Sequence, residues 1–253
     1  MAALAAMCAT AAADPALPRV VTAPTAWIPD AGEGVLTAGI DFRGDTLVGA
    51  TLGLGGIASI ELDDDSTVRA CEACDQRAQP VELGRADFRL ALHQGRWRPA
   101  LAFGVRNTFG AAIPHTLAQL VPAGDSLVPR VTEAYLVASR ELLPGRWRIR
   151  LHAGGIAQES RIAGLGTGLV VRPVGGVELG TPQYPRTTLI GDLAWVPDLN
   201  AATGPVTSWI AGWGVRYAAW PWANVELDVR NREGEGLGDT TVMLRIDLVT
   251  QRP

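Results

Sequence analysis

The chain has 253 residues, of which 47% are hydrophobic and 19% are charged. No apolar run reaches the roughly 20 residues that a membrane-spanning helix requires, because Gly, Arg or Asp interrupts each run. The formal net charge is −4 and the 22 basic residues, all of them arginines, are dispersed along the chain, so there is no basic field for a nucleic acid partner.

The N-terminus combines a leader-like run with a stretch rich in Pro and Gly. Residues 1–13 form an apolar, alanine-rich run that ends in an Ala-x-Ala pattern, which predicts a signal peptide cleaved near Ala13. The run lacks the basic start of such signals, which leaves open a truncated leader or an upstream start codon. We expect residues 14–33 to form an extended segment that either enters the lumen of the following domain or rests at its mouth.

Residues 34–250 show strands rather than helices. Apolar and polar side chains alternate with period two in segments of about ten residues, which is typical of half-buried strands. The connections between the segments alternate short and long, from the tight Gly55-Gly56 to stretches such as 108–130, 157–170 and 197–205. The alternation predicts twelve strands, at 34–43, 46–54, 57–63, 84–94, 97–107, 131–141, 146–156, 171–180, 186–196, 206–218, 222–231 and 239–249.

Nearly every predicted strand carries one apolar and one charged face, and no amphipathic helix is available to cover the apolar faces. A closed barrel in lipid satisfies this pattern, since its outside is apolar and its interior polar. The sequence therefore predicts an all-β fold, a single antiparallel up-and-down transmembrane β-barrel of about 12 strands. The side chains expected to line its lumen are Arg85, Asp87, Arg89, Arg98, Arg106, Glu133, Arg146, Arg148, Arg150, Arg216, Glu226, Asp228, Arg245 and Asp247.

The tryptophans give a second indication of a membrane. Tryptophan prefers the membrane interface, where its ring is buried and its N–H remains hydrated. Several lie within a residue or two of a predicted short turn, and others lie on neighbouring strands toward the far rim. We expect an aromatic girdle formed by Trp97, Trp147, Trp195, Trp220 and Trp222.

Chemistry-bearing motifs are few. Cys71 and Cys74 predict a disulfide in an oxidising compartment, because one Cys-x-x-Cys without a second pair is a poor zinc site. The acidic run from Glu61 to Asp65 lacks the spacing of a calcium loop and is interpreted as a solvated loop end. There is no nucleophile motif. We therefore expect no enzymatic activity, no metal and no cofactor.

One short stretch resembles a known family. Pro24-Thr-Ala26, followed by Pro29, Gly32 and Glu33, an alternating strand and the glycine hairpin that ends at Gly56, is similar to the start of YjbH-type outer-membrane barrels, which are associated with exopolysaccharide secretion. The likeness covers about residues 22–62. It implies an outer-membrane location and a connection to polysaccharide, and it carries over no catalytic residue.

Three functions remain open at this point. The arginines of the predicted lumen favour a narrow pore for small polar or anionic solutes. Opposite charges on neighbouring strands favour instead a structural or accessory barrel linked to envelope or exopolysaccharide export. A soluble periplasmic β domain that binds a ligand would require the apolar faces to point inward. The expected partners are outer-membrane lipid, the barrel assembly machinery, and small solutes or polysaccharide, at the outer membrane of a Gram-negative bacterium.

Overall fold

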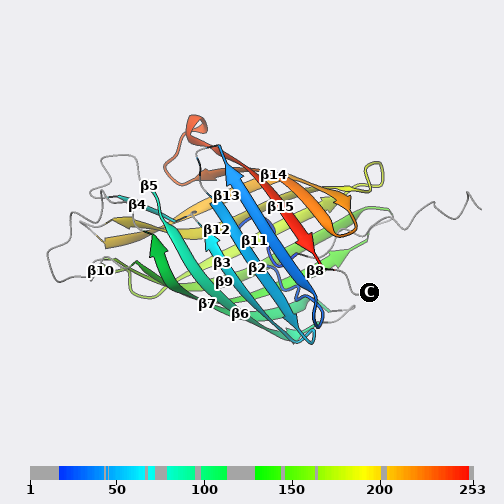
Figure 1. Cartoon of the computed structure of the whole chain (residues 1–253), viewed down its shortest axis with the longest axis horizontal. Coiled ribbons are helices and arrows are strands. Elements are labelled where there is room, and N and C mark those ends of the chain that lie inside the picture. The colour runs from blue at the N-terminus through cyan, green and yellow to red at the C-terminus, as the bar shows by residue number, and fades with distance from the viewer. Residues whose placement is uncertain are drawn as a thin grey trace, which may run out of the picture.

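The chain folds into a closed antiparallel barrel (Figure 1), seen in a computed structural model that describes residues 17–42, 44, 46–65, 68–71, 79–94, 98–112, 129–143, 146–162, 165–200 and 204–250. The predicted signal peptide, residues 1–13, lies outside the described residues. Twelve strands form the wall. They are β1 (Gly34–Asp41), β2 (Thr46–Leu54), β3 (Ala58–Asp65), β6 (Glu82–His93), β7 (Ala100–Ala112), β8 (Arg130–Leu142), β9 (Arg148–Ile162), β11 (Val170–Gly180), β12 (Thr187–Asn200), β13 (Gly204–Trp220), β14 (Ala223–Arg232) and β15 (Thr241–Val249).

The first and last strands close the ring. β1 pairs with β15 in an antiparallel register that runs from Val35 opposite Val249 to Asp41 opposite Met243. Every other neighbour in the wall is antiparallel as well. Closure satisfies the hydrogen-bonding groups that an open sheet would leave at two edges, and a barrel in hydrocarbon requires this. The predicted all-β antiparallel barrel of about twelve strands is confirmed.

The two faces of the wall have opposite polarity. On β15, Arg245 and Asp247 are buried, whereas Leu244, Ile246 and Leu248 are exposed. The same alternation recurs around the ring, so that large apolar side chains cover the outside and charged side chains fill the inside. Soluble monomers rarely expose a continuous apolar belt. The belt therefore faces lipid.

The two ends of the barrel differ. At one end, named here the turn end, short connections join the strands at residues 55–57, 94–99, 143–147, 181–186 and 221–222. The tightest glycine turn joins β2 to β3, where Gly55 and Gly56 have φ values of 73° and 70° that glycine adopts without strain. At the other end, named the loop end, β9, β12 and β13 extend beyond the predicted strands. Much of the predicted loops 157–170 and 197–205 is therefore strand.

Short strands cross the loop end. β4 (Arg69–Cys71) pairs in parallel with β12 and antiparallel with β5 (Gln79–Pro80), although the connection that contains both begins at β3 and ends at β6. β3 and β12 stand on opposite sides of the ring, so this connection spans the mouth of the barrel. Arg69 fastens it with an ion pair to Glu235, at 2.5 Å between Nη1 and Oε1.

Two smaller elements complete the described chain. β10 (Leu165–Gly166) pairs with the end of β9, and a short 3₁₀ helix spans Leu237–Asp239. Among the described residues, no helix has the length and apolar content that a membrane crossing requires.

Candidate functional site: the closed lumen

The N-terminal segment occupies the interior of the barrel. Residues 17–26, named here the luminal hairpin, run inward from the turn end, reverse direction, and return. The Val20 N–H donates to the carbonyl of Ala23 at 3.0 Å at the reversal, and the Thr25 N–H donates to Pro18 at 2.9 Å between the arms. Leu17 packs at the turn end against Val35 and Val249. The predicted extended segment is thus a hairpin within the lumen.

Guanidinium groups from the wall hold the hairpin at its carbonyl groups. Arg216 on β13 and Arg245 on β15 donate to the carbonyl oxygen of Val20 at 3.2 and 2.8 Å. Arg245 also donates to Val21 at 2.9 Å, and Arg89 on β6 donates to a carbonyl of the first arm at 2.8 Å. A hydrogen bond with a charged partner contributes about 1.5–3 kcal/mol. The hairpin is therefore held from several sides of the ring.

One carboxylate binds the tip of the hairpin. Oδ2 of Asp192 on β12 accepts the backbone N–H groups of Val21, Thr22 and Ala23 at 3.0, 2.5 and 2.6 Å. Asp192 is buried, and three convergent backbone donors offset the cost of burying its charge. This arrangement fixes both the position and the orientation of the turn.

Glycines on the wall make room for the hairpin. A side chain at Gly212 would place its Cβ 2.9 Å from Val21 Cγ1, and one at Gly176 would lie 2.9 Å from Val20 Cγ2. Where the segment leaves the lumen, a Cβ at Gly53 would lie 2.1 Å from a backbone oxygen. These glycines therefore leave space for the tip of the hairpin and for the segment where it leaves the lumen.

Ion pairs fill the space between the hairpin and β3, β6, β7 and β8. Arg19 of the hairpin pairs with Glu61 at 2.7 Å and also with Asp63. On the wall, Arg85 and Arg106 bind carboxylates at 2.9 to 3.2 Å. The remaining members of this cluster are Arg89, Asp87, Glu133 and Tyr135, whose hydroxyl donates to Asp87 at 2.7 Å.

A second group of ion pairs lies across the lumen. Arg216 contacts Glu178 at 3.0 Å and also binds Glu226, which in turn binds Arg245. The group extends to Arg150, which pairs with Glu141 and Glu178, and to Asp228 and Asp247 beside Arg245. Buried pairs of this kind are costly to break, because removing one partner leaves an uncompensated charge.

The buried charges nearly cancel. Among the described residues, nine arginines and ten carboxylates are buried, Arg19 of the hairpin included. Three cavities lined by described residues along this interior are small, with about 20 Å³ of free volume each. Such a volume accommodates about one water molecule. Within the described part of the chain, the lumen is closed to solutes in this conformation.

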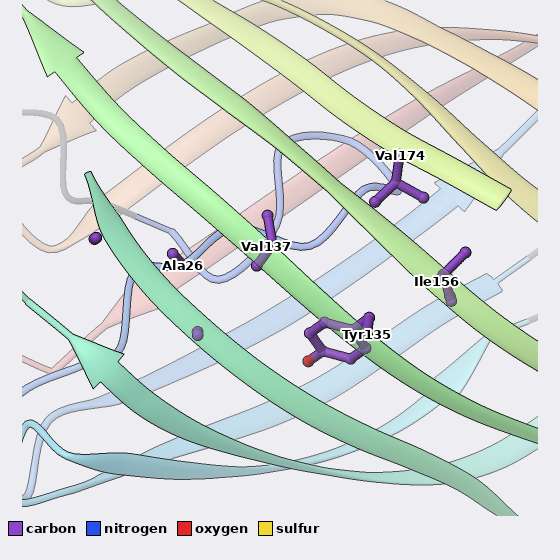
Figure 2. Packing of buried hydrophobic residues seen from close by; sticks show 7 residues of the cluster. Ala26, Tyr135, Val137, Ile156 and Val174 are labelled. Carbon is purple, nitrogen blue, oxygen red and sulfur yellow. The ribbon is translucent and has the colours of Figure 1, made fainter. Parts of the chain in front are cut away.

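One side of the interior is apolar. Ala26 of the hairpin packs with Tyr135 and Val137 of β8, Ile156 of β9 and Val174 of β11, as Figure 2 shows. Trp27, Ile28 and Trp195 pack against this cluster, and a smaller one joins Ala23 to Ala194, Val196 and Ile210. Sequence alternation did not indicate this apolar half, because it arises where small and aliphatic residues occupy inward positions.

Most of the side chains predicted to line the lumen lie inside the barrel. Arg148 is half-buried and donates to Thr188 at 3.2 Å. Arg98 and Arg146 are exposed at the turn end, so their predicted luminal position is wrong; each precedes its strand, where the period-two alternation does not apply. Those that are buried are Arg85, Asp87, Arg89, Arg106, Glu133, Arg150, Arg216, Glu226, Asp228, Arg245 and Asp247.

Sequence reasoning missed several buried charges. Arg230 and Arg232 continue the inward alternation of β14, which the sequence shows, whereas nothing local marks Arg19. The acidic run is also corrected: Glu61 and Asp63 are buried on β3 and paired with arginines rather than placed at a solvated loop end. Within the part of the chain that the structure describes, no three His, Cys, Asp or Glu side chains form a group suited to a metal.

The predicted girdle is distributed over both rims. Trp147, Trp220 and Trp222 are exposed at the turn end, and the last two stack with centroids 5.5 Å apart. Trp195 lies toward the loop end, opposite Trp209 on β13. Trp97 and Cys74 lie outside the described residues, and the side chain of Cys71 is not described, so the disulfide stays a prediction.

Comparison with solved structures identifies the type of barrel. The structure of the KdgM porin superposes with a TM-score of 0.51 at 6% identity, over 87% of this chain and 99% of that one. The chain has the fold of an outer-membrane β-barrel. The structure of the KdgM porin in complex with disordered oligogalacturonate gives a TM-score of 0.48 at 6% identity, over 87% of this chain and 99% of that one. Omp33 of Acinetobacter baumannii gives a TM-score of 0.38 at 10% identity, over 85% and 96%.

Sequence comparisons add no family. The chain matches no family model and no curated protein. The solved structures do not support the resemblance of residues 22–62 to YjbH-type barrels. In the structure, those residues carry half of the luminal hairpin, its exit at the turn end, and β1 to β3.

Proposed function

We propose that this barrel is a gated channel for small polar solutes, and that the luminal hairpin holds it closed. The observation that carries the proposal is the way the hairpin is bound. The wall binds its backbone atoms and Arg19 through hydrogen bonds and ion pairs, in addition to the small apolar clusters that hold Leu17, Ala23 and Ala26. Water can replace these polar contacts when the segment leaves, which lowers the cost of withdrawal.

Withdrawal of the hairpin would clear the centre of the lumen. The hairpin enters the lumen from the turn end and returns to the same end. The segment can therefore leave in that direction without crossing the wall. Arg89, Arg216 and Arg245 would then direct N–H donors into the passage, and Asp192 would direct an acceptor into it. Such a lining suits hydroxyl-rich or zwitterionic solutes.

The lining of the lumen does not favour anions. Without Arg19, the described lumen would retain eight buried arginines against ten carboxylates, from nine minus the one on the hairpin. The interior therefore offers no positive net field, and charge selectivity of a pore follows the sign of its lining. No enzymatic step is proposed either.

Planar-bilayer recording tests the channel. One variant replaces residues 17–26 with a Gly-Ser segment of equal length. A second variant carries Ala26→Cys and Ser139→Cys, with the native cysteines changed to serine, because the Ala26 N–H donates to Ser139 Oγ at 2.7 Å and the two positions are adjacent. We expect steady conductance from the first variant, rare openings from the unmodified barrel, and none from the oxidised second variant until it is reduced.

A structural barrel is the second candidate, and the balanced ion pairs that join nearby strands of the wall favour it. It predicts that the Gly-Ser variant conducts no more than the unmodified barrel. A heat-dependent shift in gel migration identifies folded barrels and removes misfolding as an explanation. Folded but silent Gly-Ser variants would refute the channel and leave the structural function in place.

A further inference from the structure

The backbone ladder between β11 and β12 ends before the loop end of the barrel. The ladder between these strands runs from Gly180 opposite Thr188 to Gly175 opposite Leu193. β11 continues for five residues beyond that point, paired with β9 alone, and β12 continues toward its pairing with β4 at Asp198. Pro173 and Pro197 lie along this gap, and proline has no N–H to donate to a ladder. This gap is named here the window.

One tryptophan closes the window. The Trp195 Nε1–H donates to the carbonyl of Pro173 at 2.7 Å, and the guanidinium of Arg172 lies 5.0 Å from the Trp195 ring centroid. A change of the Trp195 rotamer would break both side-chain contacts. The backbone ladder between β11 and β12 on the turn-end side of the window would remain. Arg172 is exposed, and no described carboxylate lies within ion-pair distance of it.

The window lies at the rim of the apolar belt. Trp195 is opposite Trp209 on β13, and Trp220 ends the same strand at the turn end. The eleven steps from Trp209 to Trp220, at about 3.3 Å each and a tilt of about 40°, span about 28 Å along the membrane normal, close to the thickness of a barrel's apolar band. Val171 lies on β11 at the window and is 66% exposed. The window therefore borders lipid.

The inside of the window is apolar. A cavity reaches it from the centre of the barrel, and its walls on this side are Ile156, Val174, Ala194, Trp195 and Val196. These side chains belong to the two clusters that form the apolar half of the lumen. Apolar lining therefore continues from the membrane rim into the lumen, beside the hairpin tip at Thr22 and Pro24.

We propose that the window is a lateral opening that admits the hydrocarbon chain of an acidic single-chain amphiphile, such as a fatty acid, from the outer part of the bilayer. The chain would displace Trp195 and separate the apolar cluster in order to lie against Ile156, Val174 and Val196, because the cavity there holds about one water molecule in the closed conformation. The acidic headgroup would remain at the rim beside Arg172. The apolar lining that continues from the rim into the lumen suits a hydrocarbon tail. The exposed guanidinium of Arg172, which has no carboxylate partner among the described residues, suits an acidic headgroup. This inference does not rest on the channel proposed above.

Photolabelling tests the opening. The barrel is folded into phosphatidylethanolamine and phosphatidylglycerol vesicles that contain a fatty acid with a diazirine at its chain end, and labelled residues are mapped by mass spectrometry. We expect adducts on the inward-facing Ile156, Val174 and Val196. Adducts confined to outward residues such as Val177 and Leu193 would overturn the proposal.

Cross-linking of the window supplies the matched comparison. In a background without native cysteines, Pro173→Cys with Trp195→Cys removes the indole that closes the window. We expect more luminal adducts from this variant than from the unmodified barrel. A short bismaleimide between the two cysteines closes the gap and removes those adducts. The same linker between Leu179→Cys and Leu189→Cys, which are opposite each other within the intact ladder, leaves them unchanged. Equal labelling of all these forms would overturn the proposal.

The headgroup has its own test. We expect Arg172→Gln to reduce luminal labelling by the fatty acid about fivefold, the size of an exposed ion pair, and Arg172→Lys to retain it. A fatty alcohol with the same diazirine should label both variants equally. Loss of alcohol labelling in Arg172→Gln would show a structural effect of the substitution and overturn the assigned role of Arg172.

Discussion

Replacing Asp192 with alanine should release the luminal hairpin. Its Oδ2 accepts three backbone N–H groups of the hairpin at 2.5 to 3.0 Å. A buried donor left without a partner costs about 1–3 kcal/mol, and water that enters the lumen recovers part of this. With about 1 kcal/mol lost for each donor, the docked state weakens by about 3 kcal/mol, which increases the undocked population about 150-fold.

Thiol accessibility measures that population. Val20 is fully buried at the reversal of the hairpin, and its contacts with Arg216 and Arg245 use the backbone carbonyl, so Val20→Cys leaves them in place. In a background without the native cysteines, a membrane-impermeant maleimide reacts with this thiol only when the hairpin leaves. We expect a reaction about two orders of magnitude faster when Asp192→Ala is added.

A buried aspartate that does not bind the hairpin provides the control. Asp228 is fully buried on β14, and its nearest cation is Arg245 at 3.9 Å. Asp228→Ala should change the labelling rate of Val20→Cys far less than Asp192→Ala does. If Asp192→Ala changed the rate by less than about threefold, the three hydrogen bonds would not be what holds the hairpin, and the energy assigned to them would be wrong.

Three further perturbations probe the plug, the ion-pair cluster and the lipid face. Gly212→Ala places a Cβ 2.9 Å from Val21 Cγ1, and overpacking of about 1–3 kcal/mol should speed thiol labelling of the hairpin. Tyr135→Phe removes a hydroxyl that donates to Asp87 at 2.7 Å and should lower the free energy of unfolding by about 1.5 kcal/mol in urea. Leu244→Arg places a charge on the lipid face opposite the middle of β14 and should lower the free energy of unfolding in vesicles by about 2–4 kcal/mol.

Each of these variants has a matched control. Gly191→Ala places its Cβ no closer than 3.6 Å to another atom, so labelling of the hairpin should not change. Tyr184→Phe alters an exposed tyrosine in a turn and should leave the urea midpoint unchanged. Phe42→Arg lies at the loop end of β1, and its cost should be below about 1 kcal/mol because the penalty falls toward the interface. Equal effects in variant and control would contradict the reasoning in each case.

The strands could be predicted because lipid and lumen impose opposite requirements on successive residues. Beyond the part of a strand that faces lipid, the requirement no longer holds and the strand ends cannot be predicted. Beyond the loop-end rim, β9 continues through Ala157, Glu159 and Arg161 on its outer face, where polar residues are tolerated and the alternation fades. At the turn end, Arg98 and Arg146 match the alternation on paper but lie outside the strands that enforce it.

The plug could not be predicted from local sequence. Residues 17–26 show neither the two-residue period of a strand nor the 3.6-residue period of a helix. Their conformation is fixed by Asp192 and by arginines on β13 and β15. The sequence indicated the charged interior and the pairing of opposite charges within it. It could not show that the lumen is filled, because that depends on which side chains meet across the ring. The apolar half of the lumen likewise depends on three-dimensional placement.

The contacts of the hairpin also determine when it can form. It binds partners that lie 71 residues away on β6, 171 on β12, 196 on β13 and 225 on β15. Contacts at such sequence separations form late, since each requires the closure of a long loop. The hairpin precedes every strand of the barrel in the chain, yet its last partner is on the strand that completes the ring. Docking of this segment therefore reports that the whole barrel has been assembled.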